Sequence, residues 1–250
     1  MNWYIDRDEW NKIYLWIRSV LPLNFDMDQI STDTLSSILQ KAINVIHPND
    51  ISRIISARGV AIVFGAGPSL EKDVDVAEKN DLIRNIPIFV SDGASSYLLE
   101  IGIIPTAIVT DLDGNLNDIE YLSRFGVYIF VHAHGDNIDR LFNVLRFKGY
   151  IIGTTQVEPR PYVYNFGGFT DGDRAIYIAY GLGVKRFILG GMNFNGPIGK
   201  YSAIGREKDP RIKMIKLDIA KKLILRLIRK GVEMYSLSDT GINDIKLIPQ

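Results

Sequence analysis

The sequence predicts an α/β protein with a mainly parallel, doubly wound, Rossmann-like sheet, preceded by a small helical N-terminal region. Short Val- and Ile-rich runs are hydrophobic almost without alternation, as strands buried on both faces are. Segments with helical spacing separate these runs, and strand–helix alternation of this kind is typical of parallel sheets. Glycines and polar residues directly follow several runs, where the carboxyl ends of parallel strands meet a ligand.

The N-terminal stretch, residues 1–58, differs in texture from residues 59–250, which we expect to form the α/β catalytic domain. It is predicted to contain three helices, because its apolar residues recur at helical spacing. These are expected around Trp3, Trp10, Tyr14 and Ile17, from Ser31 or Thr32 to Ile46, and from Asn49 or Asp50 to near Gly59.

The remainder alternates between predicted strands and predicted helices. The apolar runs that predict strands are residues 60–64, 87–91, 107–110, 127–131, 150–153, 186–189 and 232–237. The intervening segments that predict helices are residues 69–79, 94–101, 117–125, 137–146, 173–181 and 212–230.

Composition excludes several functional classes. The 250 residues are 46% hydrophobic and 23% charged, which suits a folded chain with a sizeable core. The absence of cysteine excludes a disulfide scaffold, a thiolate nucleophile and cysteine-ligated metals. The 29 basic residues balance the 29 acidic ones, which argues against a nucleic-acid partner. No apolar stretch approaches the ~18 residues that span a bilayer, so we expect a cytoplasmic protein with no membrane partner.

The turn after the first predicted strand is rich in glycine. It consists of Gly65, Ala66, Gly67, Pro68 and Ser69. The glycines allow a tight turn, and Ser69 is placed to cap the next helix, whose N-terminus attracts anions. The pattern predicts a phosphate-binding turn, against the alternative of a turn that serves chain geometry alone. It departs from the dinucleotide fingerprint at its third glycine position, although an acid after the second strand keeps a nicotinamide alternative open.

Three aspartates follow the next two predicted strands. Asp111 and Asp113 are two residues apart on a backbone expected to be extended, which points both side chains to one side. Carboxylates that close repel each other unless a cation lies between them. Together with Asp92 at the neighbouring strand end, they predict a Mg²⁺–phosphate site held by oxygen ligands. The alternative is an exposed turn before Gly114.

Further polar residues follow the fourth predicted strand and precede a later helix. His132 and His134 are expected to bind substrate or orient acids, with a zinc or iron site as the alternative. Asp136 and Asn137 either cap the next helix or join the magnesium site. Arg174 lies near a predicted helix start, where the helix dipole does not favour a cation, and this position indicates an anionic ligand.

Charge is segregated along the chain. Acids outnumber bases between residues 91 and 139, and bases outnumber acids between residues 200 and 230. The segment 196–211 is interpreted either as a lid that closes on phosphates or as a solvated loop. Its basic residues are Lys200, Arg206, Lys208 and Arg211.

From about Gly59 to the C-terminus, the chain resembles the archaeal 6-hydroxymethyl-7,8-dihydropterin pyrophosphokinases. The motifs behind the resemblance occur in the same order and are Gly65-Ala-Gly-Pro-Ser-Leu70, Ser91-Asp-Gly-Ala94, Thr110-Asp-Leu-Asp-Gly114, His132-Ala-His-Gly-Asp-Asn137 and Gly168-Phe-Thr-Asp-Gly-Asp-Arg174. Part of the pattern also resembles thiamine pyrophosphokinases, which implies that the predicted Rossmann-like sheet is thiamine-pyrophosphokinase-like. In those proteins a serine stands in place of Gly114, and a T-D-x-x-K motif stands where this chain has residues 135–140.

The resemblance implies transfer of diphosphate from ATP to the hydroxymethyl group of the pterin, giving AMP and the pterin diphosphate, in tetrahydromethanopterin or folate-type biosynthesis. It places Mg²⁺ on Asp92, Asp111 and Asp113 and the ATP phosphates on Gly65–Ser69. Asp136, His134 and Arg174 are then the candidates for catalysis: proton acceptance by Asp136 or His134, and charge neutralisation by Arg174. Candidates for the acceptor pocket are Gln156, Tyr164, Asn193 and Phe194.

Four alternative functions stay open. The first two are a thiamine diphosphokinase and a nucleotide-sugar-dependent transferase, since similar glycine-rich turns occur in glycosyltransferase-like proteins. The others are a nucleotide-binding module without catalysis and a metal-dependent hydrolase built on His132 and His134. Small-molecule substrates are expected in each case. A homo-oligomer is compatible with the aromatic N-terminal helix, whose apolar face suits either a core or an interface.

Overall fold

One parallel sheet organises the chain, whose computed structural model describes residues 2–203 and 209–248. Its strand order is β6-β5-β4-β3-β2-β1-β7-β8-β9, and neighbouring strands pair in parallel throughout. The strands are β1 (Val60–Phe64), β2 (Ile88–Ser91), β3 (Ala107–Thr110), β4 (Tyr128–Ala133), β5 (Tyr150–Thr155), β6 (Val163–Tyr164), β7 (Arg186–Gly190), β8 (Glu233–Ser236) and β9 (Lys246–Leu247).

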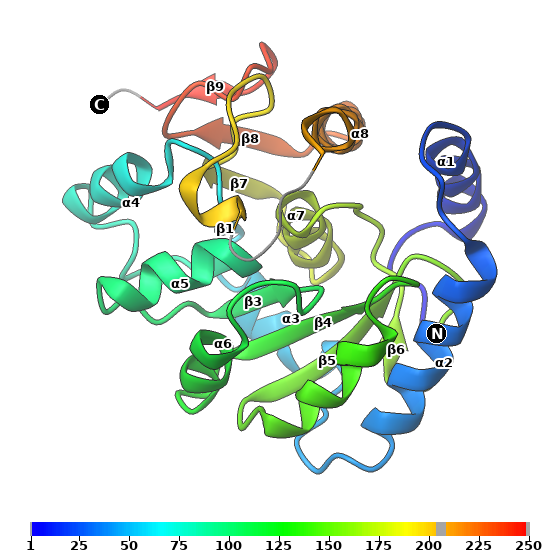
Figure 1. Cartoon of the computed structure of the whole chain (residues 1–250). Coiled ribbons are helices and arrows are strands. Elements are labelled where there is room, and N and C mark those ends of the chain that lie inside the picture. The colour runs from blue at the N-terminus through cyan, green and yellow to red at the C-terminus, as the bar shows by residue number, and fades with distance from the viewer. Residues whose placement is uncertain (1, 204–208, 249–250) are drawn as a thin grey trace.

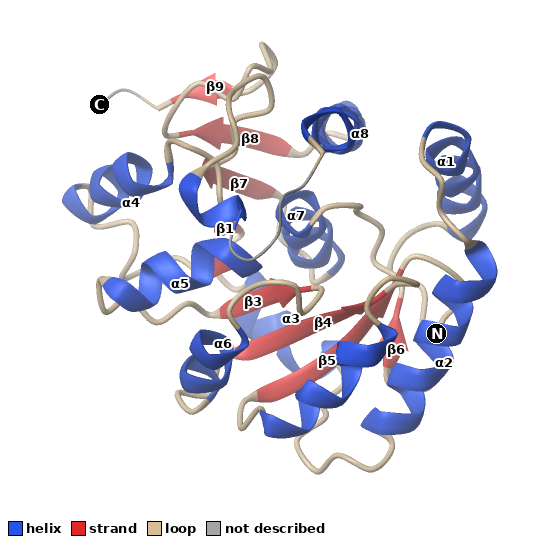
Figure 2. Ribbon diagram, in the orientation of Figure 1, coloured by secondary structure: helices blue, strands red, loops and turns tan. Residues whose placement is uncertain are grey.

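Helices cover both faces of this sheet (Figures 1 and 2). They are α1 (Arg7–Val20), α2 (Phe25–Leu39), α3 (Pro48–Ser56), α4 (Leu70–Lys79), α5 (Asp92–Glu100), α6 (Leu116–Ser123), α7 (Asp171–Gly181) and α8 (Pro210–Arg229), with 3₁₀ helices η1 (Ile138–Arg146) and η2 (Lys200–Ala203). The predicted fold class, a doubly wound parallel α/β sheet, is therefore confirmed.

Alternate side chains of each central strand enter different cores. In β1, Ala61 and Val63 pack with α1, α3, α7 and α8, whereas Ile62 and Phe64 pack with α2, α4, α5, α6 and η1. Burial on both faces explains the continuous hydrophobicity of the strands. The chain turns back between β1 and β7, which are neighbours in the sheet, and ligands of doubly wound folds bind at such a switch point.

The N-terminal helices differ in detail from the predictions. Helix α2 begins at Phe25, not at Ser31 or Thr32, because the Asn24 side chain accepts from the first free amides, and it ends at Leu39, well before Ile46. Thr32 lies inside the helix, where its hydroxyl is 2.6 Å from that of Thr155 on β5.

The flanks of α1 and α3 also differ from expectation. Trp3 precedes α1 and forms an isolated bridge with Asn165. The N-cap of α3 is His47 rather than Asn49 or Asp50, because its imidazole accepts from Asn49 N (3.1 Å) while Asp50 caps the His47 amide.

Two further differences concern short or tight elements. The segment predicted as a helix at 137–146 is the 3₁₀ helix η1, and the two-residue edge strands β6 and β9 were not predicted. Within the described part of the chain, no helix has both the length and the apolar character required to cross a membrane.

Candidate active site

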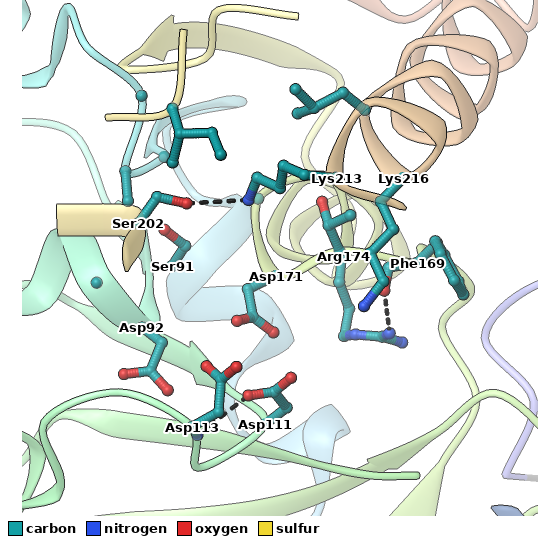
Figure 3. A pocket seen from close by; sticks show the side chains of 18 of the residues that line it. Ser91, Asp92, Asp111, Asp113, Phe169, Asp171, Arg174, Ser202, Lys213 and Lys216 are labelled. Atoms are coloured by element: carbon teal, nitrogen blue, oxygen red, sulfur yellow. Dashed lines mark hydrogen bonds between the residues drawn. The ribbon is translucent and has the colours of Figure 1, made fainter. Parts of the chain in front are cut away.

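A pocket of about 440 Å³ lies over the carboxyl ends of the central strands. The turns that follow β1, β2, β3 and β7, together with the end of β4, contribute to its wall, so the polar strand ends meet in one place. The start of α7 and the first turns of α8 close the other side. Figure 3 shows that the pocket has an acidic wall and, opposite it, a wall with basic side chains.

Asp92, Asp111 and Asp113 form the acidic wall, and we call them the acid triad. One carboxylate oxygen from each lies within 4.8 Å of those of the other two. Asp92 is buried, and its Oδ2 accepts from Thr110 Oγ1 (2.6 Å) and Gly114 N (3.2 Å). Its Oδ1 is buried without a hydrogen-bond partner in the described chain. Oxygen ligands converging on an unpaired carboxylate oxygen suit a hard divalent cation such as Mg²⁺.

The electrostatics of the triad also favour a cation, because ionised carboxylates that lie close together destabilise one another. Burial raises the pKa of Asp92 to about 7, and the hydrogen bond from Thr110 opposes this rise, while the charges of Asp111 and Asp113 increase it. A bound cation would reverse this balance by stabilising the ionised form.

Gly114 allows the triad to close. A Cβ at this position would lie 2.0 Å from Asp92 Oδ1, so no side chain fits there without displacing the carboxylate.

The backbone that joins Asp111 to Asp113 is a turn, so the expected extended conformation is wrong. Leu112 has φ of 66°, in the left-handed region that a bulky residue rarely adopts. Asp113 N donates to Asp111 Oδ1 (3.1 Å), and Leu112 N donates to Thr110 Oγ1 (2.8 Å). The two carboxylates therefore come together through a local hydrogen-bonded turn, and strain of this kind is frequent at functional sites.

The glycine-rich turn divides between two surroundings. Gly65, Ala66 and Gly67 line the pocket, and the amides of both glycines donate to the carbonyls of Gly190 and Gly191 after β7 (2.9 and 2.7 Å). A Cβ on Gly67 would lie 2.5 Å from the Gly191 oxygen, so this close crossing needs glycine.

The last two residues of the turn face away from that pocket. Pro68 lines a separate, smaller hollow. The Ser69 side chain does not cap α4, contrary to expectation, because its hydroxyl lies 2.7 Å from Asp73 Oδ2 and 2.8 Å from Asn193 Oδ1. It holds the turn against the loop after β7.

The two histidines of β4 and its exit have different surroundings. His132 is buried, its Nδ1 lies 3.2 Å from Thr154 Oγ1, and its Nε2 has no hydrogen-bond partner in the described chain. Burial and the nearby Arg174 charge lower its pKa well below the usual range. His134 Nε2 lies 3.4 Å from Asp111 Oδ2, and its Nδ1 accepts from Asp136 N (3.3 Å).

Neither histidine belongs to a metal-ligand group. The one group of three such side chains found among residues 2–203 and 209–248 is the acid triad. Asp136 lines the pocket at an exposed position outside that group. Asn137 is a positioning residue, because its Nδ2 donates to the carbonyls of Asp111 (2.7 Å) and His132 (2.8 Å) and ties two strand ends together.

Arg174 lies in the first turn of α7 and is only 1% exposed. Its Nη2 donates to Phe169 O (2.8 Å), whereas Nε and Nη1 have no hydrogen-bond partner in the described chain. Burial lowers its pKa, and the charges of Asp171 and Asp173 oppose that shift. Asp173 in turn accepts from Phe169 N (2.7 Å) and fixes the start of the helix.

The sequence analysis missed three side chains of the pocket wall. Asp171 lies between the acid triad and Arg174 (Figure 3), and burial followed by the charge of Asp111 raises its pKa well above the usual range. Lys213 and Lys216, one helical turn apart on α8, reach the pocket from the opposite side, and Lys213 Nζ donates to Ser202 Oγ (2.9 Å). The sequence did contain a signal for these lysines: they are three residues apart, and so on one face of a helix, within the basic segment 200–230.

Other predicted residues lie elsewhere. Lys200 pairs with Glu71 (3.5 Å) and Arg211 with Asp209 (3.3 Å), both at the surface. Arg206 and Lys208 fall outside the described residues. Of the acceptor-pocket candidates, Gln156, Asn193 and Phe194 line the pocket, whereas Tyr164 packs against Tyr4 with ring centroids 5.9 Å apart.

Comparison with known proteins gives the family. Residues 33–198 match the family described as 6-hydroxymethylpterin diphosphokinase MptE-like. A Pyrococcus furiosus protein named 6-hydroxymethyl-7,8-dihydropterin pyrophosphokinase is 40% identical over 90% of this chain and 95% of its own length. Proteins of the same name from Methanocaldococcus jannaschii and Methanothermobacter thermautotrophicus are 39% and 43% identical, over 88% and 68% of this chain and 95% and 74% of theirs.

A solved structure shares the fold. The MAf glycosyltransferase from Magnetospirillum magneticum AMB-1 superposes with a TM-score of 0.59 at 16% identity, over 90% of this chain. This chain spans only 39% of that protein's length. The sequence relatives confirm the resemblance inferred from the motifs, and the chain belongs to the 6-hydroxymethylpterin diphosphokinase MptE-like family.

Proposed function

We propose that this diphosphokinase transfers diphosphate from Mg²⁺–ATP to the hydroxymethyl group of 6-hydroxymethyl-7,8-dihydropterin. The observation that carries the proposal is the acid triad facing lysines of α8 across one pocket, in a chain whose relatives bear that activity in their names. An arrangement of this kind suits a metal–triphosphate, which needs carboxylates for its cation and donors for its phosphates.

In this reaction the hydroxymethyl oxygen attacks the β-phosphorus of ATP. The bond from that phosphorus to the oxygen shared with the α-phosphate breaks, and AMP leaves with that oxygen. Mg²⁺ held by Asp92, Asp111 and Asp113 would neutralise phosphate charge. The protein side chains mainly position the reactants, because phosphoryl transfer needs alignment more than covalent help.

Each wall then has its own role. The amides of Gly65 and Gly67 already donate to Gly190 and Gly191, so the turn contributes space without side chains at the two glycines, where phosphates can approach the backbone. Lys213 and Lys216 reach the phosphates from α8. Both nitrogens of His134 face neighbours, the Asp136 amide and the Asp111 carboxylate. The exposed carboxylate of Asp136 is therefore the group we assign to accept the hydroxyl proton.

The test is product analysis after incubation with ATP, Mg²⁺ and the hydroxymethyl-dihydropterin, with thiamine as a parallel acceptor. We expect AMP and the pterin diphosphate in equal amounts, and no AMP with thiamine. ADP or inorganic phosphate as the only product would refute diphosphate transfer, and AMP formed only with thiamine would change the acceptor. Placement in tetrahydromethanopterin or folate-type biosynthesis remains part of the same proposal.

A further inference from the structure

Arg174 is a buried cation whose hydrogen-bond donors are incompletely satisfied. Arg174 is 1% exposed, and one hydrogen bond, from Nη2 to Phe169 O, is the only one the described chain provides for its guanidinium. The carboxylates of Asp171 and Asp173 offset the charge of Arg174. Buried N–H donors left without a hydrogen bond still cost free energy, so they are normally satisfied by a ligand when the chain supplies no acceptor.

The remaining donors have a defined geometry. Each of the two forks of a guanidinium combines one N–H of Nη2 with an N–H of either Nε or Nη1. Phe169 O uses one Nη2 hydrogen, and Nε and Nη1 are both unpartnered. One complete fork therefore remains, whichever side Phe169 occupies. A fork binds two adjacent acceptors in one plane.

The neighbours of Arg174 favour an uncharged, planar ligand over a phosphate. The groups nearby include the imidazole of His132, with an unpartnered Nε2, and the amide of Gln156, which donates to Asp28 Oδ2 (2.7 Å). Phe169 and Phe194 add aromatic surface to the same pocket. The lysines suited to phosphates belong to a different wall, on α8.

The acceptor heterocycle of the proposed reaction matches this fork. A 7,8-dihydropterin carries its 4-carbonyl oxygen next to the imine nitrogen N5, and both are acceptors in the ring plane. Guanine presents the same pair as O6 and N7, which arginine reads with two hydrogen bonds. N5 is bonded to C6, the carbon that bears the hydroxymethyl group.

We infer that Arg174 binds the O4/N5 edge of the pterin, an inference that rests on the proposed function. The ring is thereby placed with its hydroxymethyl arm beginning beside Arg174. Asp171 lies between Arg174 and the acid triad (Figure 3), so the arm has a short course toward the phosphates. Arg174 is thus a specificity residue for the acceptor rather than a group that neutralises the transferred phosphates.

The experiment compares 6-hydroxymethyl-7,8-dihydropterin with its 5-deaza analogue, in which C–H replaces N5. Binding is measured by calorimetry with Mg²⁺ and α,β-methylene-ATP present, for the wild type, Arg174→Lys and the control Arg140→Lys. Arg140 lines the same pocket but donates to the carbonyls of Leu112 (3.2 Å) and Asp136 (3.0 Å). The control therefore changes an arginine of this pocket outside the inferred subsite.

The wild type and Arg140→Lys should bind the parent pterin about 10-fold to 100-fold more tightly than the deaza analogue. Arg174→Lys should bind the two ligands within about twofold of each other. It should also bind the ATP analogue as the wild type does. Equal binding of both pterins by the wild type overturns the inference without any variant. Full discrimination by Arg174→Lys, or weakened binding of the ATP analogue alone, also overturns it.

These outcomes separate the inference from the function beneath it. If the wild type forms AMP from ATP and the pterin but does not sense N5, the edge contact is wrong and the activity stands. If the wild type forms no AMP with the pterin, the proposed function fails and takes the inference with it.

Discussion

The acid triad and the surroundings of Arg174 lie at two ends of one pocket and differ in charge, with carboxylates at one end and a buried guanidinium at the other. At the acid end, three carboxylates crowd together, and burial raises the pKa of Asp92 to about 7, with the charges of Asp111 and Asp113 adding to the rise. At the arginine end, Nε and Nη1 of the buried Arg174 have no hydrogen-bond partner in the described chain. A bound cation would stabilise the ionised carboxylates at one end, and a hydrogen-bonding ligand would satisfy the donors of Arg174 at the other.

The two ends also differ in how they are built. The triad comes from the first residue of α5, directly after β2, and from the turn after β3, and local hydrogen bonds from Thr110 and Gly114 arrange it. The arginine end combines His132 from β4, Gln156 from beyond β5 and Arg174 from α7, so it depends on packing between distant segments. If the acid end does the chemistry, changes to its carboxylates should cost more activity than changes to the basic wall, and protons should compete with its cation.

The largest effect is expected for Asp111→Asn. If Asp111 binds the metal as we propose, its loss removes several kcal/mol of charge stabilisation in the transition state, so kcat/KM should fall by about 1,000-fold or more. The rate of AMP formation measures it. Asp139→Asn, at an exposed position, is the control and should keep full activity. Retention of activity by Asp111→Asn would remove this residue from the site.

Gly114→Ala should lower kcat about 100-fold, because the added Cβ would lie 2.0 Å from Asp92 Oδ1 and displace that carboxylate. Gly196→Ala is the matched control, since its Cβ would approach no atom closer than 3.6 Å. Unchanged kinetics together with unchanged thermal unfolding would show that the triad tolerates a side chain at Gly114.

The affinity for Mg²⁺ should depend on pH through Asp92. Its folded-state pKa, about 7, is raised from an ordinary 3.8, so protonation competes with the cation below pH 7. The Mg²⁺ affinity should fall up to about tenfold between pH 7 and pH 6. The rise in unfolding temperature caused by Mg²⁺ reports this change, and a rise that is equal at both pH values would contradict it.

The raised pKa of Asp92 also determines whether the stability of the metal-free protein rises or falls with pH. The stabilising contribution of Asp92 is fully present below about pH 4 and is lost as the pH rises through about 7. Without Mg²⁺, the unfolding temperature should therefore fall over this range by more in the wild type than in Asp92→Asn.

The smallest effect is expected for Lys213→Gln, which should raise the KM for ATP by about 3-fold to 5-fold, since solvent screens a partly exposed charge. Lys222→Gln is the control and should leave the KM unchanged, since Lys222 lies on the same helix outside the pocket lining and pairs with Asp218 (2.7 Å). Equal KM values for the wild type and Lys213→Gln would exclude this lysine from the phosphate site.

Sequence reasoning recovered the part of the site that local chemistry determines. The strand ends converge because all strands are parallel, so the order of strands and polar turns along the chain was enough to place Asp92 and Asp111 together. The left-handed Leu112 could not be foreseen, because nothing in its residue type favours that conformation. Asp171 and Lys213 were missed for another reason, since long connections bring them to the pocket. Asn24 and His47 were not predicted as N-caps, because hydrophobic periodicity does not define the residue at which a helix begins.

The crossing of the glycine turn and the loop after β7 has a consequence for the chain while the ribosome synthesises it. Gly191 N donates to Asp73 Oδ2, 118 positions earlier in the chain, and the glycine turn donates to the same late loop. A ribosome adding about 5–20 residues per second needs roughly 6 to 24 seconds to cover that separation. The nascent chain therefore displays this turn long before its counterpart exists, and a polypeptide released early contains the glycine turn without the loop that shapes it.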